Sequence, residues 1–140
     1  FALVGKAQTD LSMLAGLSNV HLLGQQPYSS LPAYCRGFDV GVIPFRMNEL
    51  TLRVNPLKLR EYLAAGLPVV STPLPEVVRY NGLVHIAVNK SGFLEAIDLA
   101  LKERSPENDR RRVEAMRSEN WESRVSEMCD VIQSRLAEVP

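Results

Sequence analysis

One segment of this sequence gathers basic side chains immediately before a predicted helix. The segment 41–60 has four basic residues and one acidic residue in a chain with no net charge: Arg46, Arg53, Lys58 and Arg60 against Glu49. At the start of the helix, the N–H groups of Leu57 and Lys58 are predicted to lack acceptors, and the helix dipole adds partial positive charge. These conditions suit a phosphate or diphosphate. A capped surface helix with ordinary solvated cations would give the same pattern.

The helix predicted over residues 56–65 has recognisable signals at both ends. Asn55 is a good N-cap, because its side-chain oxygen can accept one of the unpaired backbone N–H groups. Pro56 suits the first helical position, where its missing N–H costs nothing. Gly66 can end the helix in a left-handed conformation, and Pro68 prevents its continuation.

Glu61 lies in the same helix, three residues after Lys58, so the two side chains occupy neighbouring parts of its surface. A carboxylate in this place could accept hydrogen bonds from both hydroxyls of a sugar diol. The alternative is a surface Glu–Lys pair that stabilises the helix by about 0.3 kcal/mol. Helix geometry does not decide between them.

Short apolar runs alternate with helical segments over residues 1–88. The runs that resemble strands are Phe1–Val4, Val20–Leu23, Asp39–Ile43, Pro68–Ser71 and Val84–Val88. Several are almost continuously hydrophobic, as in parallel strands covered on both faces. The helical segments between them are Asp10–Ala15, Tyr28–Arg36 and 56–65. The pattern predicts a parallel α/β fold, in which ligands bind beyond the carboxyl ends of the strands. The long loop Pro44–Asn55 follows one such end.

The last third of the chain is typical of three amphipathic helices. The first is predicted over residues 91–104, and the second is capped by Ser105 and runs to about residue 117. The residues expected to face inward from the first are Leu94, Ile97 and Leu101. The third covers residues 121–136, and we expect its apolar side chains to pack on the chain's own domain: Trp121, Val125, Met128, Ile132 and Leu136.

Composition excludes several classes of function. The 140 residues are 46% hydrophobic, and sixteen basic residues balance sixteen acidic ones, which fits one soluble domain. A nucleic-acid binder would need a basic excess. No apolar run is long enough to cross a membrane. Cys35 and Cys129 form no C-x-x-C pair, and His21 and His85 are far apart, so we predict no disulfide framework and no metal site.

Several segments, taken in order, resemble one protein family. They are Asp39-Val-Gly-Val-Ile-Pro-Phe45, Asn55-Pro-Leu-Lys58 and Glu61-Tyr-Leu-Ala-Ala-Gly-Leu-Pro-Val-Val-Ser-Thr72. Asn19–Gly24, Tyr28–Tyr34 and the pair Trp121 and Arg124 agree with them. Together they resemble the carboxyl-terminal, donor-binding half of retaining GT-B glycosyltransferases of family 4, or group 1, which includes sucrose and glycogen synthases.

The resemblance implies a Rossmann-like three-layer sandwich with a parallel sheet, in a single domain over residues 1–140 with 121–140 as its C-terminal helix. The family transfers a sugar, here of hexose type, from a nucleotide-diphosphate-sugar to an acceptor hydroxyl. Polysaccharide or glycoconjugate synthesis is the implied pathway, with a UDP- or GDP-linked donor, no metal and no other cofactor. The implied location is the cytoplasm, with attachment to the inner membrane face through another part of the enzyme.

The family's binding residues carry over to particular positions of this sequence. Glu61 resembles the second carboxylate of the E-x7-E motif, which binds the ribose hydroxyls. The backbone from Asn55 through Pro56 and Leu57 to Lys58 corresponds to the place where the diphosphate meets a helix. The loop from Gly24 to Tyr28 corresponds to the one that lies against the nucleobase. No catalytic residue is assigned within this chain.

One position departs from the family pattern. Eight residues before Glu61 the motif has another glutamate, which contacts the transferred sugar, and Arg53 stands there instead. An arginine could clamp the diphosphate. Asn48, Glu49 or Thr51 could supply the sugar contact instead, and Glu49 is the best candidate of the three. Two alternatives stay open. Arg53 in place of glutamate favours a non-catalytic α/β module that has lost donor binding. The other alternative is a nucleotide-sugar epimerase domain, which would use the same nucleotide pocket.

The family's domain also begins with one more strand and helix, which carry a Gly-rich turn and an Arg/Lys pair. This unit is not found before Phe1, so the sequence resembles a fragment that also lacks the amino-terminal acceptor domain. We therefore expect the chain to be inactive alone.

Overall fold

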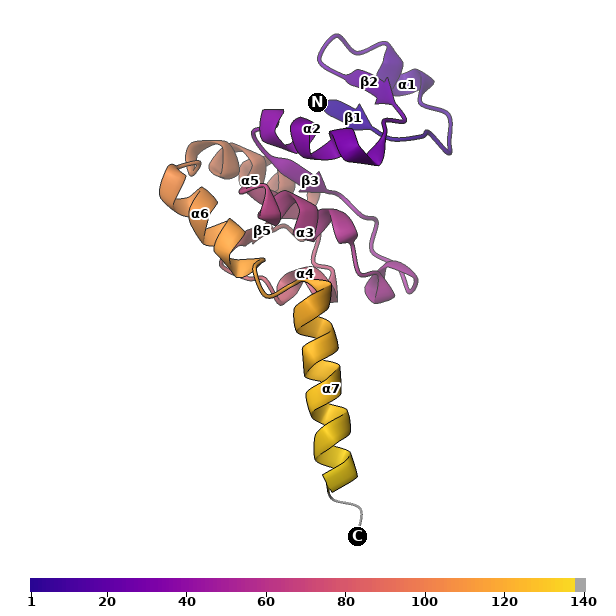
Figure 1. Ribbon diagram of the computed structural model, residues 1–140. Helices are drawn as coiled ribbons and strands as arrows, with labels where there is room; N and C mark the ends of the chain where they lie inside the picture. The colour runs from indigo at the N-terminus through magenta and orange to yellow at the C-terminus, as the bar shows by residue number, and fades with distance from the viewer. Residues whose placement is uncertain (138–140) are drawn as a thin grey trace. The chain divides into compact units, whose positions relative to one another are not determined.

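The computed structural model describes residues 1–137 (Figure 1). The chain divides into two compact units, Phe1–Tyr34 and Cys35–Pro140. The elements of the first unit are β1 (Ala2–Val4), α1 (Ser12–Ala15), β2 (His21–Gly24), the 3-10 turn Tyr28–Ser30 and the start of α2 (Leu31–Gly37). The two strands pair in parallel, with Ala2 opposite His21.

The expectation of strands covered on both faces fails for β1 and β2. All four residues of β2 are exposed, and β1 has two exposed residues and one half-buried residue. A two-stranded sheet has an edge on either side, and the four-residue helix α1 contains no buried residue. The apolar side chains of this unit therefore stay largely in contact with water.

The second unit holds the other three strands. Its elements are β3 (Gly41–Ile43), the 3-10 turn Thr51–Arg53, α3 (Leu57–Ala64), β4 (Val69–Ser71), α4 (Pro75–Val78), β5 (Val84–Ile86), α5 (Lys90–Lys102), α6 (Pro106–Ala115) and α7 (Trp121–Ala137). The strands form a parallel sheet in the order β3-β4-β5, with Val69 opposite both Gly41 and Val84. This arrangement confirms the predicted α/β fold class.

Successive residues of β4 belong to opposite faces of this sheet, as the pleat of a strand requires. Val69 packs in a cluster with Leu59 and Leu63 of α3. Val70 packs in a second cluster with Ala96 and Ala100 of α5. The sheet therefore has a helical layer on each side, which makes the unit a Rossmann-like three-layer sandwich.

The inward face of α5 differs from the prediction. Leu94 and Leu101 are 55% and 51% exposed, whereas Ala96 and Ala100 are buried. Phe93 and Ile97 pack with the two alanines. Sequence periodicity favoured the larger leucines, but the face that contacts β4 is built on small side chains, which let the helix approach the sheet closely.

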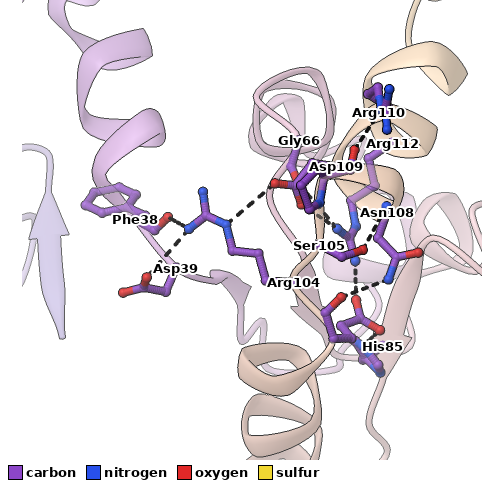
Figure 2. A network of polar contacts seen from close by, with 12 residues as sticks. Phe38, Asp39, Gly66, His85, Arg104, Ser105, Asn108, Asp109, Arg110 and Arg112 are labelled. Carbon is purple, nitrogen blue, oxygen red and sulfur yellow. Dashed lines mark hydrogen bonds and ion pairs between the residues drawn. The ribbon is translucent and has the colours of Figure 1, made fainter.

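A polar network joins three parts of the second unit (Figure 2). Arg112 of α6 is 3% exposed and pairs with both Glu103 and Asp109. It also donates a 3.4 Å hydrogen bond to the carbonyl of Gly66, which follows α3. His85 of β5 lies 2.9 Å from the same Glu103. The network holds α6 against the end of α3 and the end of α5.

The predicted packing of α7 on its own domain is wrong. The helix begins at Trp121 as expected, but Trp121 is 85% exposed and the side chains along its stripe are exposed too: Val125, Met128, Ile132 and Leu136. The apolar side chains recur with the helical period, but no other element of the second unit covers them within the described residues. Residues 138–140 of the predicted 121–140 helix lie outside the described residues. Between residues 1 and 137, every helix is too short or too polar to span a lipid bilayer.

Candidate functional site

The start of α3 is built differently from the sequence prediction. The N-cap is Pro56 rather than Asn55, and no side chain caps the helix. Asn55 instead uses its Oδ1 to accept a 2.5 Å hydrogen bond from Nη1 of Arg60. Pro56 has extended backbone angles, which a proline ring allows. Its carbonyl accepts the N–H of Leu59 at 3.0 Å.

The N–H groups of the first turn keep the predicted position. Leu57 and Lys58 precede Leu59 at the start of the hydrogen-bond ladder, where backbone N–H groups have no acceptor within the helix. Gly66 follows α3 with a φ of 78°, the left-handed conformation that the sequence predicted for it. The positive end of the α3 dipole therefore points out of the helix at Leu57.

Lys58 is held above an aromatic ring. Its Nζ lies 5.5 Å from the centroid of the Phe45 ring, within the range of a cation–π interaction. Phe45 follows β3 and packs against the core cluster that contains Ile43 and Leu59. The ring is thereby anchored, and it fixes where an otherwise mobile ammonium group lies beside the first turn of α3.

Glu61 is half-buried one turn further along. Burial is the main cause that raises the pKa of the Cys35 thiol, and the negative charge of Glu61 adds to it. Burial likewise raises the pKa of Tyr62, with smaller contributions from Cys35 and Glu61. The Glu61 carboxylate thus acts electrostatically on both groups, on the side of α3 that faces Cys35.

Gly41 allows Tyr62 to pack against β3. A Cβ at this glycine would lie 2.4 Å from Cδ2 of the Tyr62 ring, far closer than atoms can approach. Tyr62 follows Glu61 directly, so the bare backbone of Gly41 helps to set the position of the carboxylate.

The long loop 44–55 is ordered by its own side chains. The hydroxyl of Thr51 donates to the carbonyl of Arg46 at 2.7 Å and accepts the N–H of Asn48 at 2.8 Å. The Thr51 N–H in turn donates to Oδ1 of Asn48 at 2.9 Å. Thr51 and Asn48 therefore stabilise the loop through their polar groups, whereas Glu49 and Arg53 are exposed on its surface.

Gly24 and Tyr28 lie in the first unit. Gly24 ends β2 with a φ of 65°, and its carbonyl accepts the N–H of Gly5 at 2.8 Å. A hollow of about 620 Å³ lies at the carboxyl ends of β1 and β2, lined by residues that include Gly24, Lys6 and Gln25 but not Tyr28. Ligands of parallel sheets bind at such ends. Tyr28 is 76% exposed.

The second unit brings together Asn55, Leu57, Lys58 and Glu61 at the first turns of α3. Sequence reasoning missed Phe45, Cys35 and Tyr62, whose positions around Lys58 and Glu61 depend on tertiary packing within the second unit. The presence of an aromatic residue directly after a buried strand was a usable signal for Phe45. Among residues 1–137, no three metal-ligating side chains of the His, Cys, Asp and Glu types lie together.

Comparison with known proteins connects this geometry with one family. A relative from Bacillus subtilis (strain 168), named "Putative teichuronic acid biosynthesis glycosyltransferase TuaH", is 42% identical over 62 residues. That match covers 44% of this chain and 16% of the relative. The family model described as "Glycosyl transferases group 1" matches residues 1–103. Because the match extends over most of the chain and includes the loop, the start of α3 and Glu61, the chain belongs to the group 1 glycosyltransferases.

Proposed function

We propose that this chain binds the nucleotide-sugar donor of a glycosyltransferase with the GT-B architecture. The diphosphate would lie at the first turn of α3, where the N–H groups of Leu57 and Lys58 and the ammonium of Lys58 attract it. The Glu61 carboxylate would accept hydrogen bonds from the ribose hydroxyls. Gly24 and Tyr28 would contact the nucleobase of a UDP- or GDP-linked donor. Transfer of a hexose to an acceptor hydroxyl would need a second, acceptor-binding domain, so the chain alone would be inactive.

One observation carries this proposal. Lys58 and Glu61 stand one turn apart at the open start of α3, so a cation and a diol-accepting carboxylate flank the same helix terminus. A diphosphate joined to a ribose presents the two complementary groups, an anion and a vicinal diol. The group 1 family match supports the same assignment.

The pathway follows from the relative and remains part of the proposal. The B. subtilis relative is named for teichuronic acid biosynthesis, and we propose that this chain also serves the synthesis of a polysaccharide or glycoconjugate. We propose that the donor is held without a metal, because backbone N–H groups and Lys58 would neutralise the diphosphate. Its place of action would be the cytoplasm, at the inner membrane face.

Arg53 favours a second candidate function, an α/β module that has lost donor binding. It is exposed in the loop and stands where the family motif has a sugar-contacting glutamate. A guanidinium could clamp the diphosphate, but the loss of the carboxylate could equally leave an α/β module without donor binding. Glu49, also exposed in this loop four residues earlier, is the carboxylate that could replace it.

Titration with UDP, GDP and ADP, followed by amide NMR shifts, tests the proposal. We expect one diphosphate to shift the signals of residues 55–61 and 24–28. Glu61→Gln should weaken the binding of that diphosphate about tenfold, because the variant lacks the charged acceptor of the ribose hydrogen bonds. Glu114→Gln on α6 is the matched control and should bind as the native chain does.

The titration separates the two candidates. The non-catalytic module predicts that no diphosphate shifts these signals, either in this chain or in a longer protein that contains it. A preferred diphosphate whose affinity is the same in Glu61→Gln and Glu114→Gln would contradict the assigned role of Glu61. Nucleotide-sugar converted to its epimer without an acceptor would identify an epimerase instead.

A further inference from the structure

The hollow at the carboxyl ends of β1 and β2 has the size and the position of a ligand site. Its volume of about 620 Å³ lies in the range of pockets that hold small molecules. The residues that line it belong to the segment 3–25, so it lies within the first unit. Gly24, a proposed nucleobase contact, is one of them. The other side chains at its wall therefore bear on which base the donor carries.

Part of this wall is apolar. Leu3 and Leu22 are register partners in the parallel pair of strands, so their side chains stand next to each other on one face of the sheet. Both line the hollow, and they are 37% and 39% exposed. Bases taken out of a stack are held between aromatic or apolar side chains. The two leucines thus provide a platform for a flat ring.

One carboxylate at the wall is oriented by its neighbour. Asp10 lines the hollow, where its Oδ1 accepts the Ser12 N–H and its Oδ2 accepts the Ser12 hydroxyl, both at 2.9 Å. The backbone hydrogen bond, followed by the hydroxyl, lowers the pKa of Asp10, so the group is an anion at neutral pH. A carboxylate has about four lone-pair positions. Ser12 uses one on each oxygen, and each oxygen keeps another for a ligand.

A cation lies at the same hollow. Lys6 follows β1 directly, lines the hollow and is exposed. Within residues 1–137, neither Lys6 nor Asp10 forms an ion pair, with each other or with any other side chain. An ammonium group donates hydrogen bonds and accepts none. The hollow therefore offers a ligand one cationic donor and one anionic acceptor, neither of them neutralised by an ion pair in the described part of the chain.

Guanine is the common base that matches both groups. Its N1–H and 2-amino group are adjacent donors, which the two oxygens of one carboxylate can accept together. Its O6 and N7 are adjacent acceptors, which a lysine can bind. Uracil has a carbonyl on either side of its N–H, and adenine has an acceptor beside its amino group. Either base would bring a lone pair against the second oxygen of the carboxylate.

We propose that this hollow binds guanine through Asp10 and Lys6. The ring would lie on Leu3 and Leu22, with N1–H and the 2-amino group on the carboxylate and with O6 and N7 toward the ammonium. The inference rests on the proposed function and deepens it, because the donor becomes a GDP-linked sugar rather than a UDP-linked one. If the main chain at Gly24 alone read the base, Asp10 would have no part in the choice.

Amide NMR titration of the chain with GDP, inosine diphosphate, UDP and ADP tests the inference. Inosine diphosphate lacks the 2-amino group of guanine, so it keeps one of the two hydrogen bonds to the carboxylate. We expect GDP to shift the signals of residues 5–10 and 22–25 and to bind about tenfold more tightly than inosine diphosphate. UDP and ADP should bind more weakly than GDP by at least the same factor.

Asp10→Asn is the decisive variant. It should weaken the binding of GDP about tenfold and remove the preference for GDP over inosine diphosphate. Xanthosine diphosphate has a carbonyl in place of the 2-amino group, which the native carboxylate repels and the amide of Asp10→Asn can bind. This variant should therefore bind xanthosine diphosphate at least tenfold more tightly than the native chain does, a gain that loss of fold cannot produce.

Asp130→Asn, on the exposed surface of α7, is the matched control and should bind every nucleotide as the native chain does. Four results would overturn the inference. They are no movement of the signals of the hollow at millimolar GDP, UDP or ADP bound as tightly as GDP, equal affinity of the native chain for GDP and inosine diphosphate, and the same affinities in Asp10→Asn and Asp130→Asn.

The donor-site proposal fails through different results. If UDP binds more tightly than GDP and shifts the signals of residues 55–61, the donor site stands and only the guanine assignment is lost. GMP, which has the base without the diphosphate, gives the converse test. If GMP shifts the signals of the hollow while no diphosphate shifts those of residues 55–61, the guanine site stands and the diphosphate site at α3 is lost.

Discussion

Arg60 and Glu119 form an ion pair with 3.2 Å between Nε and Oε2, although 59 positions separate them in the sequence. The guanidinium of Arg60 also lies 5.7 Å from the centroid of the Tyr80 ring. Arg124 bonds to the same carboxylate from α7 at 2.8 Å. One carboxylate therefore fixes α3 relative to the first turn of α7.

This carboxylate should make stability depend on pH. Burial alone would raise the pKa of Glu119, but hydrogen bonds and charges from Arg124 and Arg60 outweigh it and lower the pKa below the ordinary 4.5. A lowered folded-state pKa gives stability that is fully present above the unfolded-state pKa and is lost as pH falls through the folded-state pKa. Glu119→Gln should cost about 1 kcal/mol at neutral pH and flatten the loss of stability below about pH 4.5.

Urea denaturation at several pH values measures this effect. Glu114→Gln is the control, because Glu114 pairs with Arg117 only on the exposed surface, where both side chains are more than two-thirds exposed. A pH profile of Glu119→Gln that parallels that of the native chain would argue against the assigned role of Glu119.

The helix caps give a second prediction, which uses two asparagines. Asn89 caps α5 by accepting the N–H of Gly92 at 2.9 Å, so Asn89→Ala should destabilise the chain by about 1 kcal/mol. Asn55 caps no helix in the structure, and Asn55→Ala should cost less than about 0.5 kcal/mol. Both values come from the midpoints of urea unfolding curves. Equal costs would restore Asn55 as the cap of α3.

Gly41 gives a third prediction, on packing. Gly41→Ala places a methyl group against the Tyr62 ring and should cost about 1–3 kcal/mol. Gly37→Ala is the control, since nothing lies within 4 Å of the added methyl group. Combining Gly41→Ala with Tyr62→Leu should recover part of the loss, and strictly additive costs would show that the ring is not what the methyl group meets.

Arg112 gives a fourth prediction, on buried charge. Arg112→Met leaves Glu103 and Asp109 without their partner and should cost about 3 kcal/mol, at the low end for a broken buried pair because both carboxylates are about a third exposed. Arg111→Met on the outer face of the same helix should change stability by less than about 0.5 kcal/mol. Thermal and urea unfolding of the two variants measure the difference. Similar stabilities would mean that the network contributes little.

Phe45 gives a fifth prediction, on donor binding. Phe45→Leu removes the ring beneath Lys58. It should weaken the binding of the preferred diphosphate two- to fivefold, because an exposed cation–π contact contributes about 0.5–1 kcal/mol. Phe45→Tyr keeps the ring and should bind as the native chain does. The same NMR titration measures both affinities, and equal weakening in the two variants would exclude an effect of the ring.

Much of the fold was predictable because local signals agree with the tertiary arrangement. The five apolar runs and the helix signals at Gly66 and Ser105 mark elements that the structure contains, with boundaries shifted by at most three residues. Periodicity could not identify the buried face of α5, because two alanines contact the sheet there and carry a weak hydrophobic signal. Nor could it foresee that the apolar stripe of α7 lies in water.

The candidate site was predictable only where its residues are neighbours in sequence. Leu57, Lys58 and Glu61 were found because they share one helix and its first turns. Asn55 was assigned as a cap from residue type, but Arg60 competes for its side-chain oxygen and only the folded chain reveals that contact. The pairing of Arg60 with Glu119 has no local signal at all, because it depends on where α6 ends relative to α3.

The alternation of Val69 and Val70 in β4 also determines how the second unit should open. One residue of the strand belongs to the layer with α3 and the next to the layer with α5, so β4 cannot separate without disturbing both layers. Amide hydrogens of β4 should therefore exchange with solvent only through global unfolding, while those of α7, which contains no buried residue, should exchange through local fraying. The slowest-exchanging amides would then trace the central strand of the sheet.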